Sequence, residues 1–317
     1  MPSTESFSAA GILRQAREWG IEATPHAPLS PHVTIGVGGS AELLVTVPFR
    51  AQLNLLWQTL RGEGIPAVLL GGGSNVAFAD GLTQAVVVLN RTAELTEVEP
   101  GLLAVDSGLR WPDFFAASLR REWGGLEFLA GIPGTLGGAA AVNAGAFGRS
   151  FGECLVGAEI VDENGRYREV TGDYFAFTYR HSRLKFGTQA ILRLFVRVTP
   201  RPRSEMEEDL RRVVLHRRGH HPPLAVFPSA GCFFQNPLDR GVKVGAGKLI
   251  EECGLKGTRC GDAEVSPQHA NFLVNRGHST FTDLAGLAER VARQVHQRTG
   301  ITLEREVIFI SPTGAKY

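Results

Sequence analysis

The sequence predicts an α+β protein in which strands and helices are intermixed along most of its 317 residues. Short apolar runs bounded by turn residues, such as IPAVLL at 65–70 and AVVVL at 85–89, are typical of buried strands. Segment 50–61 instead places apolar residues at helical spacing. A break just after residue 199 separates a C-terminal part with helices and strands of its own.

The first part of the chain is expected to open with a helix and then, from about residue 31 to residue 89, to alternate strands with a second helix. Residues 1–20 predict a short amphipathic helix that ends at Gly20, and no basic region precedes an apolar core, so we expect no signal peptide. The elements predicted next are strands at 33–37, 42–47, 65–70 and 85–89 and a helix at 50–61.

The middle part, residues 94–199, is rich in predicted strands. Its predicted elements are strands at 102–105, 158–162, 167–170 and 190–198 and a helix at 112–122. The sequence DENG at 162–165 predicts a hairpin turn.

The last part opens after the proline-rich stretch 199–203. Ser204 and Glu207 predict a capping box that starts a helix reaching Arg218. A helix at 282–299 and a strand at 305–310 are expected to end the chain.

Composition excludes several classes of protein. Lys and Arg number 33 against 32 Asp and Glu, so no excess of positive charge indicates binding to nucleic acid or to an acidic membrane. Hydrophobic residues make up 43%, and no apolar run reaches membrane-spanning length. The four cysteines are too few and too irregularly spaced for a disulfide framework, and none forms the CxxC pair of a structural zinc site. We therefore expect a cytoplasmic protein.

The most informative stretch is the glycine-rich run at 125–148, in which small apolar residues surround a single amide, Asn143. Because the side chains are so small, backbone N–H groups can lie close to a neighbouring group. Successive backbone amides in glycine turns form sites that bind pyrophosphate. A tightly packed helix pair or hairpin is the alternative explanation. A lone glycine run does not decide between the two.

A second glycine cluster favours the phosphate site. The predicted strand 65–70 leads directly into GGGSN at 71–75, which presents backbone donors, a hydroxyl and an amide at the carboxyl end of a strand. Neither cluster has the GxGxxG pattern of a Rossmann site. Lys248 is followed by leucine in place of serine or threonine, so a P-loop is excluded as well.

From about residue 28 to residue 310 the chain resembles the UDP-N-acetylenolpyruvoylglucosamine reductase family, through eight motifs in the family's order. These are TIGVGG at 34–39, LGGGSNV at 70–76, GIPGTLGGAAAVNAGAFG at 131–148, YRHS at 179–182, SAGCFFQNP at 229–237, AGKLI at 246–250, CGLKG at 253–257 and LEREV at 303–307. The resemblance implies a two-subdomain FAD-binding fold of the vanillyl-alcohol oxidase type (PCMH-type) and a C-terminal α/β substrate-binding domain.

The resemblance also implies a division of the chain. The parts are an N-terminal helix and lead-in (1–30), two FAD-binding subdomains (31–89 and 90–199), a substrate-binding domain (200–300) and a strand and tail carrying a catalytic glutamate (301–317). It implies non-covalent FAD, NADPH as electron donor and a UDP-sugar substrate, in peptidoglycan precursor synthesis. The expected FAD contacts are Thr34, Gly38, Gly71, Gly72, Gly73, Ser74, Asn75, Gly131, Ile132, Pro133, Gly134, Gly137, Gly138, Ala139, Asn143, Gly145 and Ala146.

Three residues match the chemistry of the family's reaction. A hydride from reduced flavin reaches the substrate's enol ether, and the negative charge that develops needs a fixed cation and a proton donor. By motif position, Arg180 is expected to hold the carboxylate and stabilise the enolate, and Glu306 to act as an acid. Without the family match, a surface arginine and a solvated carboxylate are the simpler interpretations, and Glu304 is the alternative acid.

Cys232 stands where many members of the family carry serine as the proton donor, and a thiol preserves that role. Without that context it would be interpreted as a small buried hydrophobic residue. Tyr179 and Asn236 are expected substrate contacts. Gln235 replaces a common lysine, which puts one diphosphate contact in doubt.

Other functions stay open at this point. An FAD-dependent oxidase of another small molecule and a catalytically inactive binder of nucleotide sugars are the two alternatives. His220 and His221 have no carboxylate at ligand spacing, so we predict no metal site. We expect a monomer or a weak dimer, with no membrane or nucleic-acid partner.

Overall fold

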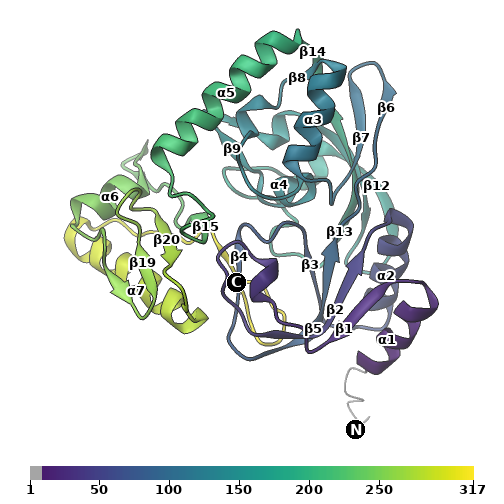
Figure 1. Ribbon diagram of the computed structural model, residues 1–317, viewed down its shortest axis with the longest axis horizontal. Helices are drawn as coiled ribbons and strands as arrows, with labels where there is room; N and C mark the ends of the chain where they lie inside the picture. The colour runs from purple at the N-terminus through teal and green to yellow at the C-terminus, as the bar shows by residue number, and fades with distance from the viewer. Residues whose placement is uncertain (1–8) are drawn as a thin grey trace. The chain divides into compact units, whose positions relative to one another are not determined.

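The computed structural model describes residues 9–317, and these divide into two compact units (Figure 1). Unit 1 contains the residues up to Ala27, Ala41–Gly72 and Gln84–Leu215. Unit 2 contains Pro28–Ser40, Gly73–Thr83 and His216–Tyr317. Three of the described elements, β2, β5 and α5, therefore begin in one unit and end in the other.

The first half of unit 1 is a small sheet packed against two helices. Its elements are α1 (Ala9–Glu18), β1 (Glu22–Pro25), β2 (Ser40–Val47), α2 (Arg50–Gly62), β3 (Ala67–Leu70) and β5 (Leu82–Asn90), with strand order β1-β2-β5-β3. Leu53, Leu60 and Trp57 of α2 are buried with the sheet residues Val86 and Val88 in one core. The apolar spacing of α2 thus buries one face of the helix on the sheet.

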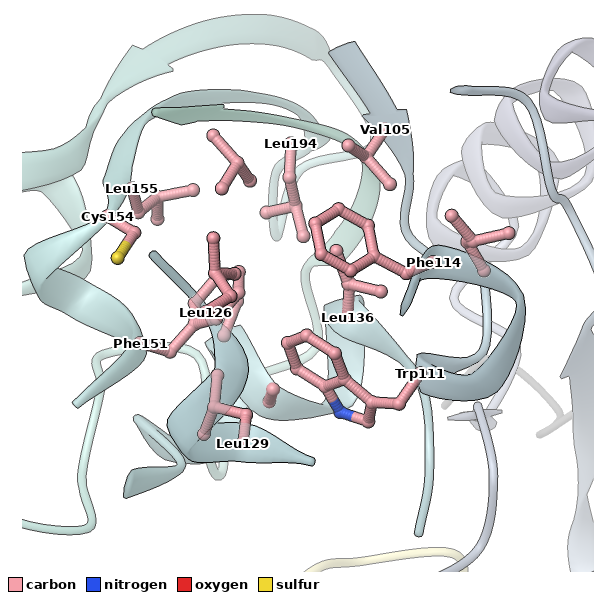
Figure 2. Close-up of a cluster of buried hydrophobic side chains, with 14 of the residues drawn as sticks. Val105, Trp111, Phe114, Leu126, Leu129, Leu136, Phe151, Cys154, Leu155 and Leu194 are labelled. Atoms are coloured by element: carbon pink, nitrogen blue, oxygen red, sulfur yellow. The ribbon is translucent and has the colours of Figure 1, made fainter. Parts of the chain in front are cut away.

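The second half of unit 1 is a five-stranded antiparallel sheet in the order β12-β11-β13-β7-β6. Its strands are β6 (Leu95–Glu99), β7 (Leu102–Asp106), β11 (Leu155–Val161), β12 (Tyr167–Thr171) and β13 (Ala190–Arg197). Helices α3 (Trp111–Arg121) and α4 (Leu136–Val142) pack on this sheet, and Figure 2 shows Trp111, Phe114 and Leu136 in the shared core. The predicted hairpin turn at 162–165 is confirmed, because β11 and β12 pair antiparallel across it.

Charged residues join the two halves of unit 1. Arg50, at the start of α2, contacts Asp106 of β7 at 3.3 Å and Glu159 of β11 at 2.8 Å. Arg193 of β13 also contacts Asp106, at 3.3 Å. Burial raises the pKa of Asp106 although both arginines act in the opposite direction. The network therefore orients α2 on the second sheet at the cost of a buried carboxylate.

Unit 2 contains a four-stranded antiparallel sheet, a two-stranded parallel pair and two helices. The sheet is ordered β15-β20-β19-β18, with β15 (Ser229–Cys232), β18 (Arg259–Cys260), β19 (Ala263–Val265) and β20 (Phe272–Asn275). The other elements are β4 (Val76–Phe78), α6 (Ala246–Glu252), α7 (Phe281–Thr299) and β21 (Ile308–Ile310), with β21 parallel to β4. Helix α5 (Arg203–His220) ends in this unit, and β16 (Leu238–Asp239) and β17 (Val242–Lys243) form a short hairpin.

One predicted strand is absent, and the predicted starts of α5 and of the final strand are wrong. Residues 33–37 form no strand, although the alternating side chains of Val33, Ile35 and Val37 are all buried. Gly36 and Gly38, with φ of 67° and 145°, turn the chain away from extended geometry. Helix α5 starts at Arg203, so Ser204 lies within the helix, and the final strand starts at Ile308, two residues after Glu306.

A cluster of histidine rings in unit 2 makes the stability of this unit sensitive to pH. The His221 ring lies 4.9 Å from Phe272 and 5.6 Å from His269. Burial, with smaller contributions from the nearby Arg217 and His269, lowers the pKa of His221 from an ordinary value of 6.5 to about 4. Between these two pH values the unfolded chain binds the proton that the folded chain does not.

We therefore expect the free energy of unfolding to decrease as the pH falls from about 6.5 to about 4. His221→Phe keeps an aromatic ring at this position and cannot bind a proton. Urea unfolding between pH 7 and pH 4 should show a weaker loss of stability in this variant. Equal losses in the variant and the parent would contradict the assignment.

Candidate functional site

The two glycine clusters meet in unit 1. Gly71 and Gly72 directly follow the carboxyl end of β3, a strand parallel to β5. A Cβ atom added to Gly72 would lie 2.5 Å from the Cα of Gly134, and one on Gly71 would collide with the Thr135 hydroxyl. The two turns therefore pack backbone against backbone, and a side chain at either position would separate them.

The glycine run does not continue as a loop through Gly138, because α4 begins at Leu136. The Thr135 side chain caps the helix by accepting a hydrogen bond from the Gly138 N–H at 3.2 Å. The N–H of Gly137 donates to the carbonyl of Ser107 at 2.8 Å. Gly137, Gly138 and Ala139 thus form the first turn of a helix fixed to the second sheet of unit 1.

The loop that precedes α4 contains the expected contacts Gly131, Ile132, Pro133 and Gly134. Gly131 and Gly134 have φ of 74° and 123°, a region that side chains disfavour. Gly131 and Pro133 are exposed, as is Gly138 at the start of α4. Three of the exposed or half-exposed residues here are glycines, so backbone atoms are accessible. Backbone N–H groups in such turns are the donors that bind a diphosphate.

Another group of expected FAD contacts belongs to unit 2. The N–H of Thr34 donates to the carbonyl of Gly73 at 2.9 Å, and the Thr34 hydroxyl donates to the carbonyl of Ser229 at 2.7 Å. Gly38 adopts a φ of 145°, and a Cβ there would lie 2.9 Å from the Cβ of Phe78. Ser74 follows Gly73, and the side chain of Asn75 donates to the carbonyl of Glu306 at 3.3 Å.

Asn143 connects the end of α4 to the turn that carries Tyr179 and Arg180. Its side-chain N–H donates to the Thr178 carbonyl at 2.8 Å, and its side-chain oxygen accepts from the Gly152 N–H at 3.0 Å. The Asn143 side chain is buried, and the residue ends the helix with a φ of 48°. These bonds support a structural role for Asn143 beside its expected FAD contact.

Arg180 lies at the tip of a tight turn. Thr178 and His181 close the turn with reciprocal backbone hydrogen bonds of 3.1 and 3.2 Å. Arg180 has a φ of 55°, a left-handed conformation that costs an arginine about 1–3 kcal/mol. Its guanidinium Nη2 donates to the carbonyl of Gly145 at 2.6 Å, so the arginine is anchored to the glycine run.

The residues after Asn143 form a small hairpin. β9 (Gly145–Ala146) pairs with β10 (Arg149–Ser150), and Phe147 and Gly148 form its turn with φ of 52° and 77°. Such a turn normally starts with Asn, Asp or Gly. Phe147 is 54% exposed in this turn and was not among the predicted site residues.

Cys232 and Glu306 lie on neighbouring segments of unit 2. Cys232 is the last residue of β15, and the next residue, Phe233, accepts a hydrogen bond from the Glu306 N–H at 2.8 Å. The N–H of Gln235 donates to the carbonyl of Glu304 at 2.8 Å. Segments 233–235 and 304–306 therefore run side by side. Glu306 is half-buried and Glu304 exposed, which supports Glu306 as the acid.

A buried amide that sequence reasoning missed fixes this region. Asn271 is 2% exposed, and its side chain accepts from the Phe234 N–H at 2.9 Å and donates to the Phe234 carbonyl at 2.8 Å. Asn236 accepts a hydrogen bond from the Ala246 N–H at 2.9 Å, which ties the segment after Cys232 to α6. Within residues 9–317, no group of three or more His, Cys, Asp and Glu side chains is placed to hold a metal ion.

Comparisons with known proteins agree over about 90% of the chain. Residues 222–310 match the model of the UDP-N-acetylenolpyruvoylglucosamine reductase C-terminal domain, and residues 41–171 match that of an FAD binding domain. The UDP-N-acetylenolpyruvoylglucosamine reductase of Moorella thermoacetica is 37% identical over 290 residues, which cover 90% of this chain and 93% of the relative. This chain belongs to the UDP-N-acetylenolpyruvoylglucosamine reductase family.

Other members of the reductase family are similar to a comparable degree. That of Heliobacterium modesticaldum is 36% identical over 290 residues, covering 91% of each chain. The crystal structure of the Thermus caldophilus enzyme has a TM-score of 0.74 and 31% identity, over 91% of this chain and 98% of that one. The expected fold, with an FAD-binding part and a C-terminal domain of the reductase type, is confirmed.

The family's cofactors are FAD and NADPH, which confirms the cofactor prediction. The FAD-domain match at 41–171 includes Gly71 and Gly72 and the glycine run at 125–148. Their backbone-lined contact fits a diphosphate, so the residues present are compatible with FAD. Among the described residues, no helix has the length and apolar character needed to cross a membrane.

Proposed function

We propose that this protein catalyses the NADPH-dependent reduction of UDP-N-acetylglucosamine enolpyruvate to UDP-N-acetylmuramate, a step in peptidoglycan precursor synthesis. Bound FAD supplies the redox chemistry that links NADPH to the enol ether. The observation that carries the proposal is the hydrogen bond from Arg180 to Gly145, because it joins the candidate catalytic cation to the glycine run of the FAD-binding domain.

The backbone of the glycine turns would bind the FAD diphosphate through the donors of Gly71–Gly73, Gly131 and Gly134. Ser74 and Asn75 would add a hydroxyl and an amide. Asn143, Gly145 and Ala146 would lie near the ring system of the flavin. These assignments rest on motif position together with the contact between the two glycine turns.

Arg180 would bind the substrate carboxylate and stabilise the negative charge that spreads into it, because a guanidinium is always charged and binds a carboxylate through two nitrogen atoms. Its anchored geometry supports this role, since stabilisation of developing charge requires a fixed donor. The exposed ring of Tyr179 lies 5.5 Å from the Arg180 guanidinium and is a further candidate for substrate contact. Asn236 would contact the uridine diphosphate sugar.

Cys232 would donate the proton that quenches the substrate carbon, and Glu306 would assist as an acid. Cys232 is half-buried, whereas Cys253 is only 3% exposed. Access to solvent and reactant is what separates a proton donor from a packing thiol. The adjoining segments 233–235 and 304–306 support a shared role for the two residues.

The substrate class is a UDP-sugar, and we infer that the enzyme acts in the cytoplasm, where NADPH and nucleotide sugars are available. We also infer a monomer or a weak dimer. The decisive test of the function is NADPH oxidation measured with and without the enolpyruvyl sugar nucleotide, in the absence of oxygen. Oxidation that depends on this substrate supports the reductase. In a second assay, with oxygen and without NADPH, turnover of another small molecule would instead indicate an FAD oxidase.

We expect the purified protein to be yellow and to release intact FAD on treatment with acid or heat. The FAD-binding domain matches at 41–171, and neither histidine nor cysteine stands in the two glycine turns to anchor a flavin covalently. Absorbance of the supernatant and chromatography of the released flavin check this. A colourless protein that takes up no added FAD would contradict it.

A further inference from the structure

Lys185 is a buried cation that the proposed reaction does not use. Its side chain is 3% exposed, and lysine is almost never buried to this extent unless it is paired. Its Nζ donates a hydrogen bond to the backbone carbonyl of Arg180 at 3.3 Å. A buried charge is costly without a hydrogen-bond partner, so the contact with Arg180 is a specific one.

The segment that carries Lys185 is itself fixed to α4. The hydroxyl of Ser182 donates to the carbonyl of Ala141 at 2.6 Å and accepts from the Leu184 N–H at 3.1 Å. The N–H of Lys185 donates to the carbonyl of Ser182 at 3.2 Å. The backbone of Lys185 is therefore anchored. Its side chain extends from this fixed position to the turn at 178–181.

The carbonyl that Lys185 holds belongs to a residue in a disfavoured conformation. Arg180 has a φ of 55°, which positions its carbonyl and its side chain differently from an ordinary turn residue. The same residue anchors its guanidinium at Gly145, 2.6 Å away. The hydrogen bonds from Lys185 and to Gly145 thus hold the backbone and the side chain of Arg180, in addition to the Thr178–His181 bonds that close the turn.

We propose that Lys185 is a positioning residue for Arg180: its ammonium holds the Arg180 carbonyl and so keeps the backbone in the conformation from which the guanidinium reaches Gly145. The inference rests on the proposed role of Arg180 in binding the substrate carboxylate. Lys185 acts through Arg180 and does not itself touch the reacting atoms.

Lys185→Met tests this, because methionine keeps a long unbranched stem and removes the ammonium. Reoxidation of NADPH-reduced enzyme by saturating enolpyruvyl substrate should slow by about 10- to 100-fold, the range expected for a misplaced catalytic group. The rate of FAD reduction by NADPH and the FAD content should stay close to those of the parent. Arg183→Met is the matched control, since it removes an exposed positive charge from the same segment, where Arg183 lies over the Tyr174 ring at 4.7 Å.

A double-mutant cycle decides whether Lys185 acts through Arg180. In an Arg180→Ala background, Lys185→Met should have almost no further effect on reoxidation. Effects that multiply would overturn the inference, as would parallel slowing of both half-reactions with loss of FAD. Normal reoxidation in Lys185→Met beside a slow Arg180→Ala refutes only the role of Lys185. Normal reoxidation in Arg180→Ala itself refutes the proposed function of Arg180.

Lys185→Gln is a second substitution with which the same double-mutant cycle can be measured. Its neutral amide retains a hydrogen-bond donor without the ammonium charge, so reoxidation should slow less than in Lys185→Met. If the methionine variant does not fold with FAD, Lys185→Gln is placed in the parent and in the Arg180→Ala variant instead. Equal slowing by glutamine in both backgrounds would overturn the inference.

Discussion

Replacing Arg180 with alanine is expected to slow reduction of the enolpyruvyl substrate by roughly two to four orders of magnitude, because the variant lacks the cation that stabilises the developing negative charge. Glu306→Gln should slow the same step within this range by removing the acid. Reduction of FAD by NADPH should stay nearly normal in both variants. Anaerobic stopped-flow measurement of the two half-reactions separates these effects.

Two neighbouring residues serve as controls. Arg183→Ala removes an exposed arginine from the segment that follows Arg180, and Glu304→Gln changes an exposed carboxylate two residues before Glu306. Both controls should reduce the substrate at close to the parent rate. If Arg180→Ala and Glu306→Gln slow the two half-reactions in parallel, the residues are structural or bind NADPH, and the assigned roles are wrong.

Cys232→Ala is expected to accept electrons from NADPH normally and then to stall, because alanine cannot donate the proton that completes the reaction. We expect the substrate-dependent step to slow by roughly 10²- to 10⁴-fold. Cys232→Ser should keep substantial turnover, since serine is nearly isosteric and its hydroxyl can donate a proton. Single-turnover reoxidation by substrate, without oxygen, compares the two variants.

A structural thiol predicts the opposite order. Alanine would then lose only a small volume, whereas serine would bury an extra hydroxyl. Cys253, buried at the end of α6, provides the comparison: Cys253→Ala and Cys253→Ser should follow this structural order in urea unfolding and leave the half-reactions unchanged. If reoxidation is faster in Cys232→Ala than in Cys232→Ser, Cys232 is a structural thiol and not the proton donor.

The sequence predicted most helices and strands because each has a strong local pattern. Helix α7 is an example: it was expected at 282–299 and spans Phe281–Thr299, with its capping box at Thr280 and its terminal Gly300. The error at 33–37 shows what the pattern measures. The apolar residues Val33, Ile35 and Val37 are buried, as the alternating pattern indicated. Side chains can be buried at alternate positions without the backbone pairing with another strand.

The candidate site was less predictable than the fold. Motif similarity suggested Arg180, but no local pattern could show its left-handed backbone or its bond to Gly145, because both depend on the fold of a distant segment. Asn271 was missed for the same reason, because its side chain contacts the backbone of Phe234, 37 positions away. Lys185 was missed although its partner, the Arg180 carbonyl, is only five positions away, because no local pattern shows that the lysine is buried. The roles of Arg180, Cys232 and Glu306 stay predictions that the variants above test.

The parallel pairing of β4 with β21 has a consequence for synthesis of the protein. Asn75 and Glu306, which flank this pair and share a hydrogen bond, are 231 positions apart. At typical translation speeds the ribosome needs roughly 10–50 s to make the chain between them. During that time β4 has emerged without its partner, and an unpaired apolar strand edge invites aggregation. Residues 76–78 therefore have no β21 to pair with until the last residues of the chain leave the ribosome.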